Sequence, residues 1–184
     1  MVTPECTTTL PNDVPRISRV RIGGATKSEL LSKLDEAHVC LNLLAQALFA
    51  DSRFTTAAVT SLVEVAEVSV AGLGLCRGAT FVQIVGRAAS GGLSLCPLEV
   101  GPYLRLQLTN QPEGFLGQTT SQNCAPPGAI TVASAPLSDD DQTPKGFYLR
   151  CIEGVLWLRG YRSWVGHVWS PEDVFIFARS LNAA

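Results

Sequence analysis

Residues 146–161 read GFYLRCIEGVLWLRGY, the segment that decides most of the predicted fold. Its two halves, Phe147–Ile152 and Val155–Tyr161, have the apolar and aromatic content that is typical of β-strands. Between them lie Glu153 and Gly154, a pair suited to the two-residue turn of a β-hairpin. The segment therefore predicts an antiparallel hairpin, and a turn of these two residues fixes its register.

In this register the hairpin has one apolar side, because successive side chains of a strand point in opposite directions. Leu149 lies opposite Leu158 and Cys151 lies opposite Leu156, with Phe147 on the same side. We expect this side to face the core. The other side combines arginine with aromatic rings.

The mixed side of the hairpin is the candidate binding surface. Each of its arginines faces an aromatic residue across the hairpin, close enough to stack at roughly 0.5–1 kcal/mol per pair. Aromatic planes beside arginine suit nucleotides, single-stranded nucleic acid, sugars or acidic peptides. A structural interpretation stays open, in which the stacking protects a sheet face or a helix covers it. The predicted binding residues are Tyr148, Arg150, Trp157, Arg159, Tyr161 and Arg162.

Helical and strand patterns follow one another in the rest of the chain. Capping boxes, in which a threonine and a Glu or Gln three residues later satisfy each other's backbone donors, begin helices at Thr26 and Thr80. The run Thr109–Gly128 holds little besides small and polar residues, and a loop of this length is either mobile or functional. We treat it as a candidate flap over the hairpin. The pattern predicts strands at 17–22, 62–70, 104–108, 130–137 and 174–178, and helices from 26, at 41–49 and from 80 to the glycines at 91–92.

These elements predict an α+β fold, an antiparallel sheet with two to three helices packed on one face. At 184 residues the chain suits one domain, which we place at residues 26–184 after a loose N-terminal tail at residues 1–25. The hydrophobic content of 46% supports a core that needs no metal or disulfide.

Charge and cysteine content limit the partners and the cellular location that we expect for the protein. The net charge of −2 does not favour nucleic acid as a partner, although a local patch leaves it open. No apolar run reaches the roughly 18 residues of a membrane span, and the first residues lack the pattern of a secretory signal. The six cysteines form no CxxC pair. We therefore expect thiols, a cytoplasmic location and no membrane partner.

Two further motifs are weak. Gly72, Gly74 and Gly78 follow a predicted strand, but their spacing departs from that of a dinucleotide-binding loop. Asp139–Asp141 offers carboxylates to a hard cation, yet it lacks the spacing of a calcium loop, so we expect a solvated turn. The sequence predicts no cofactor and no metal.

Several stretches carry a resemblance to a known group of proteins. They are FADSRF at 49–54, LSLCPLEVGPYLRL at 93–106, ITVASAPL at 130–137, GFYLR at 146–150, WLRGY at 157–161 and WSPED at 169–173. Together they resemble a family of small bacterial proteins of unknown function, over about residues 26–178. The resemblance implies a bacterial cytoplasmic protein with one intact domain, and it implies no activity.

The sequence favours a non-catalytic binding or interaction module that uses the mixed side of the hairpin, with an unidentified ligand or protein as partner. Two alternatives stay open. One is a small enzyme with His167, a weak catalytic candidate, as acid or base and Asp140 or Glu172 as its partner. The other is a subunit whose aromatic face forms the interface of a homo-oligomer.

Overall fold

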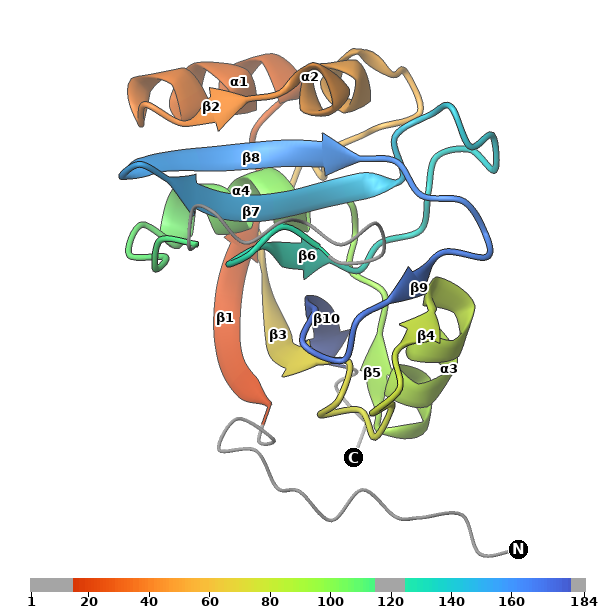
Figure 1. The fold of residues 1–184 in the computed structure, drawn as a ribbon. Helices are drawn as coiled ribbons and strands as arrows, with labels where there is room; N and C mark the ends of the chain where they lie inside the picture. The colour runs from red at the N-terminus through yellow and green to blue at the C-terminus, as the bar shows by residue number, and fades with distance from the viewer. Residues whose placement is uncertain (1–14, 115–124, 180–184) are drawn as a thin grey trace, which may run out of the picture.

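The computed structural model describes residues 15–114 and 125–179, in which a large mixed β-sheet dominates (Figure 1). The strands of this sheet are β1 Arg16–Ile22, β2 Cys40–Leu41, β3 Ser61–Ser69, β5 Leu93–Ser94, β6 Ile130–Val132, β7 Gly146–Ile152, β8 Val155–Tyr161 and β10 Val174–Arg179. Their order is β1-β3-β10-β6-β7-β8-β2, and β5 pairs with the end of β10. Two pairs, β10 with β6 and β2 with β8, are parallel. Strands β4 (Ala79–Thr80) and β9 (Val168–Trp169) pair separately.

Helices pack on both faces of the sheet in the described residues. They are α1 Lys27–Glu36, α2 Leu43–Ala50, α3 Phe81–Ser90 and α4 Val100–Gln107. Both predicted capping boxes are present, at Thr26 and at Thr80. Figure 1 shows α1 and α2 above the β7–β8 hairpin and α4 behind it, whereas α3 lies beside β4. The α+β fold is confirmed, with α3 on the face opposite the other three helices.

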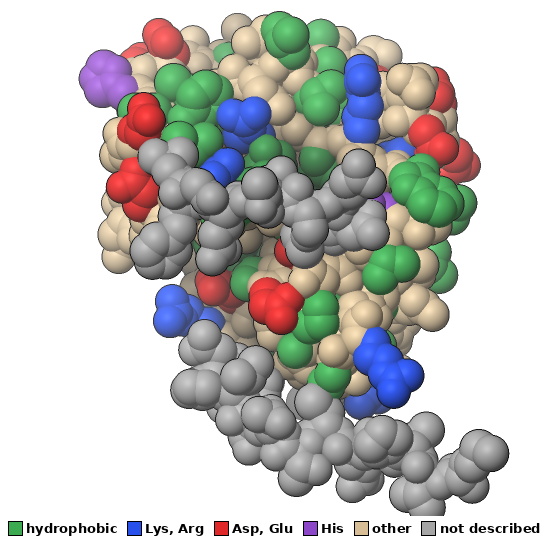
Figure 2. Space-filling view, viewed as in Figure 1, with side chains coloured by type: hydrophobic (Ala, Val, Ile, Leu, Met, Phe, Trp, Pro, Cys, Tyr) green, Lys and Arg blue, Asp and Glu red, His purple; other side chains and the backbone are tan. Residues whose placement is uncertain are grey.

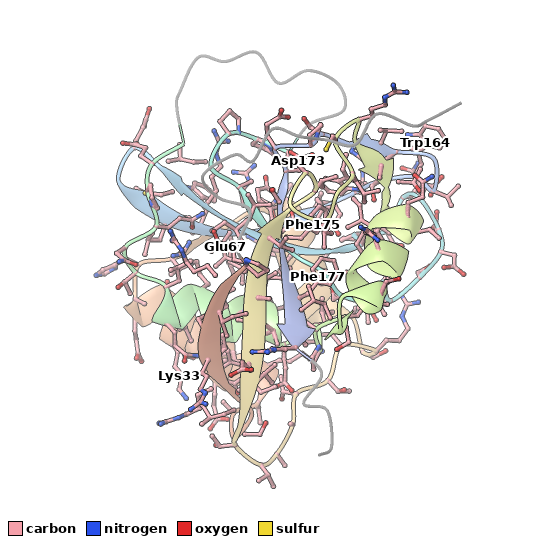
Figure 3. The ribbon with its side chains drawn as sticks, turned by 90° about the horizontal axis from the view of Figure 1, so that it is seen from below. Lys33, Glu67, Trp164, Asp173, Phe175 and Phe177 are labelled. Atoms are coloured by element: carbon pink, nitrogen blue, oxygen red, sulfur yellow. The ribbon has the colours of Figure 1, made fainter. Side chains whose placement is uncertain are left out.

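Strand β10 separates two hydrophobic clusters, because its side chains alternate between the faces of the sheet. Ile176 and Ala178 belong to the larger cluster, which includes buried residues of α1, α2 and α4. Phe175 and Phe177 belong to the smaller cluster, together with Ile84 of α3. Figure 3 shows both phenylalanines on the side of β3 where α3 lies. The predicted central, covered strand is therefore confirmed.

The strand predicted at 104–108 from the alternation of Leu104, Leu106 and Leu108 is wrong, because these leucines belong to the end of α4 and the residue after it. Val100 and Leu104 are four residues apart and both buried, so helical spacing competes with the alternation of the leucines. Pro102 is accommodated because the N–H groups of a first helical turn have no helical partner. Arg105 is fully buried, whereas an alternating strand with Leu104 and Leu106 in the core would expose it.

The strand predicted at 17–22 is confirmed as β1, and its Val20 and Ile22 are buried in the larger cluster. The sheet thus includes part of the segment that we assigned to a loose tail, whose residues 1–14 lie outside the described residues. The strand predicted at 130–137 ends already at Val132, and Ser134 makes only an isolated bridge.

The cysteines differ in their chemistry. Cys40, Cys96 and Cys151 are free, whereas Cys76 takes part in a disulfide bond. The expectation of six thiols is therefore wrong at Cys76, because a disulfide depends on proximity in space that spacing along the chain does not reveal. Burial raises the pKa of the Cys96 thiol to about 12, which keeps it protonated and inert.

The helices of the described residues are too short and too polar for one of them to cross a lipid bilayer.

Candidate functional site

The turn of the hairpin has the predicted two-residue form. Glu153 and Gly154 have φ values of 51° and 74°, which is the left-handed region required at both centres of a type I′ turn. Arg150 therefore pairs with Trp157, and Leu149 with Leu158. The register predicted from the sequence is confirmed throughout β7 and β8.

On the outer side of the hairpin, arginine stacks along a strand rather than across it. The Cζ of Arg159 lies 5.0 Å from the centre of the Trp157 ring, two residues away on β8. Trp157 is half-buried, and its backbone pairs with Cys40 of β2. The Arg159 Nε is buried and has no hydrogen-bond partner among the described residues. Figure 2 shows cationic and hydrophobic side chains side by side over this part of the molecule.

The two tyrosines of the predicted site lie deeper than expected. Tyr148 is 9% exposed and its ring centre is 6.4 Å from that of Tyr161, which in turn is 5.6 Å from that of Trp169. Burial raises the pKa of the Tyr161 hydroxyl. Arg162 is exposed, and Trp164 is 59% exposed at the rim of the molecule (Figure 3). The six predicted residues are thus neighbours, but the tyrosines support the surface more than they form it.

Both described ends of the Thr109–Gly128 loop lie against the hairpin. The Nε of Arg150 donates to the Pro127 carbonyl at 3.1 Å. The amide of Gly154 donates to the Glu113 carboxylate at 3.2 Å, beside the turn. The middle of the candidate flap, residues 115–124, lies outside the described residues.

A buried polar network fixes these loop ends. The guanidinium of Arg105 donates to the side-chain oxygen of Gln111 and to the carbonyl of Leu108. Gln111 is itself buried and donates to the carbonyls of Gly128 at 2.8 Å and Leu149 at 3.1 Å. Burial lowers the pKa of Arg105 to about 10, and no ion pair among the described residues compensates it. The network ties the loop to the sheet.

His167 has no carboxylate partner in the described part of the chain. Its ring lies edge-on to Trp169 with 4.9 Å between centres, and burial lowers its pKa. The Glu172 carboxylate accepts a hydrogen bond from the Ser170 hydroxyl, and that of Asp140 accepts the amide of Gln142 at 2.9 Å. The structure thus does not bring together the residues of the enzyme alternative.

The two weaker motifs have local structural roles. Gly74 and Gly78 have φ values of 82° and 76°, and a side chain at Gly78 would meet the carbonyl of Trp169 at 2.3 Å. Asp139–Asp141 is an exposed turn. Within residues 15–114 and 125–179, no group of three or more His, Cys, Asp and Glu side chains could hold a metal ion.

The sequence did not predict a cavity of about 530 Å³ at the other end of the sheet. We call it the basic groove, because Arg19, Arg21 and Lys33 line it, together with Tyr103 and Gln107 of α4. The sequence offered one signal for this groove: Arg19 and Arg21 lie two residues apart on one strand. Their meeting with α1 and α4 depends on packing between segments far apart in the chain.

Comparison of the chain with protein-family models, with curated proteins and with solved structures gives no match, so the resemblance in sequence gains no support from it.

Proposed function

We propose that this chain is a non-catalytic binding module whose ligand contacts the outer side of the β7–β8 hairpin. The observation that carries the proposal is the pair Arg159 and Trp157, stacked at 5.0 Å on a half-buried surface. A flat ring held in place by a guanidinium offers a stacking plane at little entropic cost. Ligands with aromatic rings or anionic groups fit this chemistry.

Each of the six predicted residues has a role in this proposal. Trp157 and Arg159 form the stacking plane, Arg150 stands directly across from Trp157, and Arg162 contributes a charge at the rim. Tyr148 stands across from Arg159, and Tyr161 packs against Tyr148. Because Arg150 already donates one hydrogen bond to the loop, its remaining guanidinium donors are those that we assign to an anionic ligand.

The partner and the setting are parts of the proposal. We favour a small ligand or an acidic peptide over nucleic acid, because the net charge is −2. We propose a bacterial cytoplasmic location because three of the described cysteines are free thiols, and in that compartment the disulfide at Cys76 would be a transient one. In the oligomer alternative, Trp157→Asp would convert a dimer to a monomer in analytical ultracentrifugation.

A thermal-shift screen tests the proposal, using nucleotides, short oligonucleotides, sugars and acidic peptides. A ligand at about 100 times its Kd adds about 2.7 kcal/mol of stability, which raises the Tm of a chain of this size by several degrees. Trp157→Ala should abolish the shift. Trp164→Ala is the matched control, because Trp164 is an exposed tryptophan outside the hairpin.

The decisive result is the difference between the two variants. A ligand that shifts wild type and Trp164→Ala but not Trp157→Ala supports the hairpin as the site. A shift that survives Trp157→Ala, or a screen in which no compound of the four classes shifts the Tm, contradicts the proposal.

A further inference from the structure

The basic groove lies where β1, α1 and α4 meet, and its cations converge from two separate elements. Arg19 and Arg21 come from β1 and Lys33 from the last turn of α1. Figure 3 places Lys33 beside β1, across the molecule from Trp164. No Asp or Glu is among the residues that line the groove. The site therefore concentrates positive charge on a chain whose net charge is negative.

The cations of the groove differ in how far other side chains satisfy them. Arg19 approaches Glu64 at 3.7 Å, a carboxylate that also meets Arg179 at 3.3 Å. Arg21 and Lys33 form no ion pair with any other described residue. Lys33 is attracted by the charge of Glu29, which lies one turn earlier on the same helix. At least two cations are thus free to meet an anion.

Tyr103 supplies a neutral hydrogen-bond donor in the same groove. Tyr103 is 8% exposed, and its hydroxyl donates to no acceptor among the described residues, while the backbone amides of Gly23 and Ala25 approach its oxygen. Burial raises the pKa of this hydroxyl, and the nearby Glu99 carboxylate raises it further. The hydroxyl therefore keeps its proton. A buried donor without an acceptor costs free energy. A ligand that accepts its hydrogen bond would remove this cost.

Hydrogen bonds between the Gln107 side chain and the backbone of β1 hold the frame of the groove together. Gln107 accepts the amide of Arg21 at 3.1 Å and donates to its carbonyl at 2.8 Å, which fixes α4 to the edge strand. Gly23 and Gly24 follow β1 with φ values of 79° and 77°. A side chain at Gly23 would meet the Val59 carbonyl at 2.2 Å. Only glycine lets the chain turn there beside the groove.

We propose that the basic groove binds a small phosphorylated molecule. Arg21 and Lys33 would contact the phosphate, since guanidinium and ammonium groups are its usual partners. The Tyr103 hydroxyl donates to the ligand, and Leu62 and Leu106 offer apolar contact to the rest of it. The volume of about 530 Å³ falls in the range of small-molecule sites. This inference concerns a surface separate from the hairpin and does not depend on the proposed function.

Isothermal titration of the full chain with AMP, ribose 5-phosphate and inorganic phosphate tests the inference, with adenosine as the uncharged control. The titrations run at about 0.15 M ionic strength, which screens long-range attraction between exposed charges. Binding of the three phosphate compounds without binding of adenosine is the expected pattern. Binding of AMP and adenosine alike, or of no compound at all, would overturn the inference.

Three variants locate the site. Arg21→Gln should weaken AMP binding about tenfold or more, as expected when a charged hydrogen bond is lost. Arg77→Gln removes the same charge from an exposed position outside the groove and should leave the affinity within about twofold. Tyr103→Phe removes a hydroxyl that donates to no described acceptor, so the fold should survive while affinity falls by several-fold. Equal affinities in Arg21→Gln and Arg77→Gln would reject the groove.

Trp157→Ala separates this inference from the proposed function. AMP binding that is lost in Trp157→Ala and kept in Arg21→Gln assigns the ligand to the hairpin and removes it from the groove. Loss of AMP binding in Arg21→Gln but not in Trp157→Ala supports the groove as the site, whatever the hairpin binds.

Discussion

The hairpin face and the basic groove both collect arginine, yet their arginines have different surroundings. On the hairpin, Arg159 lies over an aromatic ring and Arg150 donates to a backbone carbonyl. In the groove, Arg21 is exposed and has neither a carboxylate nor a ring against it in the described chain. The first set is partly satisfied by the fold itself. Of the second set, Arg19 approaches Glu64, whereas Arg21 has no ion-pair partner among the described residues.

This difference separates two uses of the same side chain. A guanidinium that packs on a ring contributes to stability even when no ligand is present. A guanidinium that stands free among like charges contributes little to the folded state and more to recognition. The two surfaces should therefore respond differently to substitution. The following predictions run from the largest expected effect to the smallest.

Gln111→Leu should break the support of the hairpin face, because it leaves the buried charge of Arg105 without its side-chain acceptor. We expect the free energy of unfolding to fall by about 3 kcal/mol. Urea denaturation measures it. The double variant Arg105→Leu/Gln111→Leu should regain part of the lost stability, because it removes the buried charge together with the acceptor of its hydrogen bond. A double variant less stable than Gln111→Leu would contradict this account.

Gly160→Ala should push β8 away from α2, because the new Cβ would lie 2.6 Å from the backbone of Leu44. Backbone atoms cannot rotate aside, so we expect a loss of about 2 kcal/mol. Gly86→Ala in α3 is the control. A Cβ there meets no atom within 4 Å, and the helix should gain about 0.5–1 kcal/mol. Similar stabilities for the two variants would show that β8 and α2 can separate at little cost.

Arg159→Ala and Arg21→Ala compare the two surfaces directly. Loss of the stack on Trp157 should cost about 1 kcal/mol of stability. Loss of the free cation in the groove should change stability by less than about 0.5 kcal/mol. Thermal unfolding without added ligand measures both. An Arg21→Ala variant as destabilised as Arg159→Ala would remove the distinction between the surfaces.

Glu99→Gln should give the smallest effect, visible as a change in pH dependence. Burial raises the pKa of Glu99 above 4.5, so the folded protein retains a proton that the unfolded chain has lost. Its contribution to stability is therefore complete below about 4.5 and is lost as the pH rises through the raised pKa. Denaturation at several pH values between about 4 and 7 should show a weaker fall for Glu99→Gln than for wild type. Parallel curves would exclude this role for Glu99.

Local rules predicted much of the fold. The Glu153-Gly154 turn and the two capping boxes are determined by neighbouring residues, and all three are present. The placement of β2 beside β8 and of α3 on the second face depends on contacts between distant segments. At residues 104–108 alternation and helical spacing competed, and burial of Val100 and Leu104 against the core decided for the helix.

The two candidate sites differ in the same way, since one depends on neighbouring residues and the other on contacts between distant segments. The hairpin surface was accessible to prediction because Arg150, Trp157 and Arg159 lie within ten residues and follow from one register. The basic groove was not, because Arg21, Lys33 and Tyr103 belong to three elements whose packing no local pattern specifies. Tyr148 is buried beside Tyr161, and Tyr161 packs against the second hydrophobic cluster, which the hairpin alone does not reveal.

The place of β10 in the sheet has a consequence for biosynthesis. This strand lies between β3 and β6, so it joins the β1–β3 pair to the β6–β7–β8 unit. Both units leave the ribosome before β10 does, each with an unpaired strand edge that can pair with another chain. Assembly of the complete sheet must therefore wait until β10 has been synthesised. A chaperone that shields β3 and β6 during this interval would raise the yield of folded protein more than one that acts on the helices.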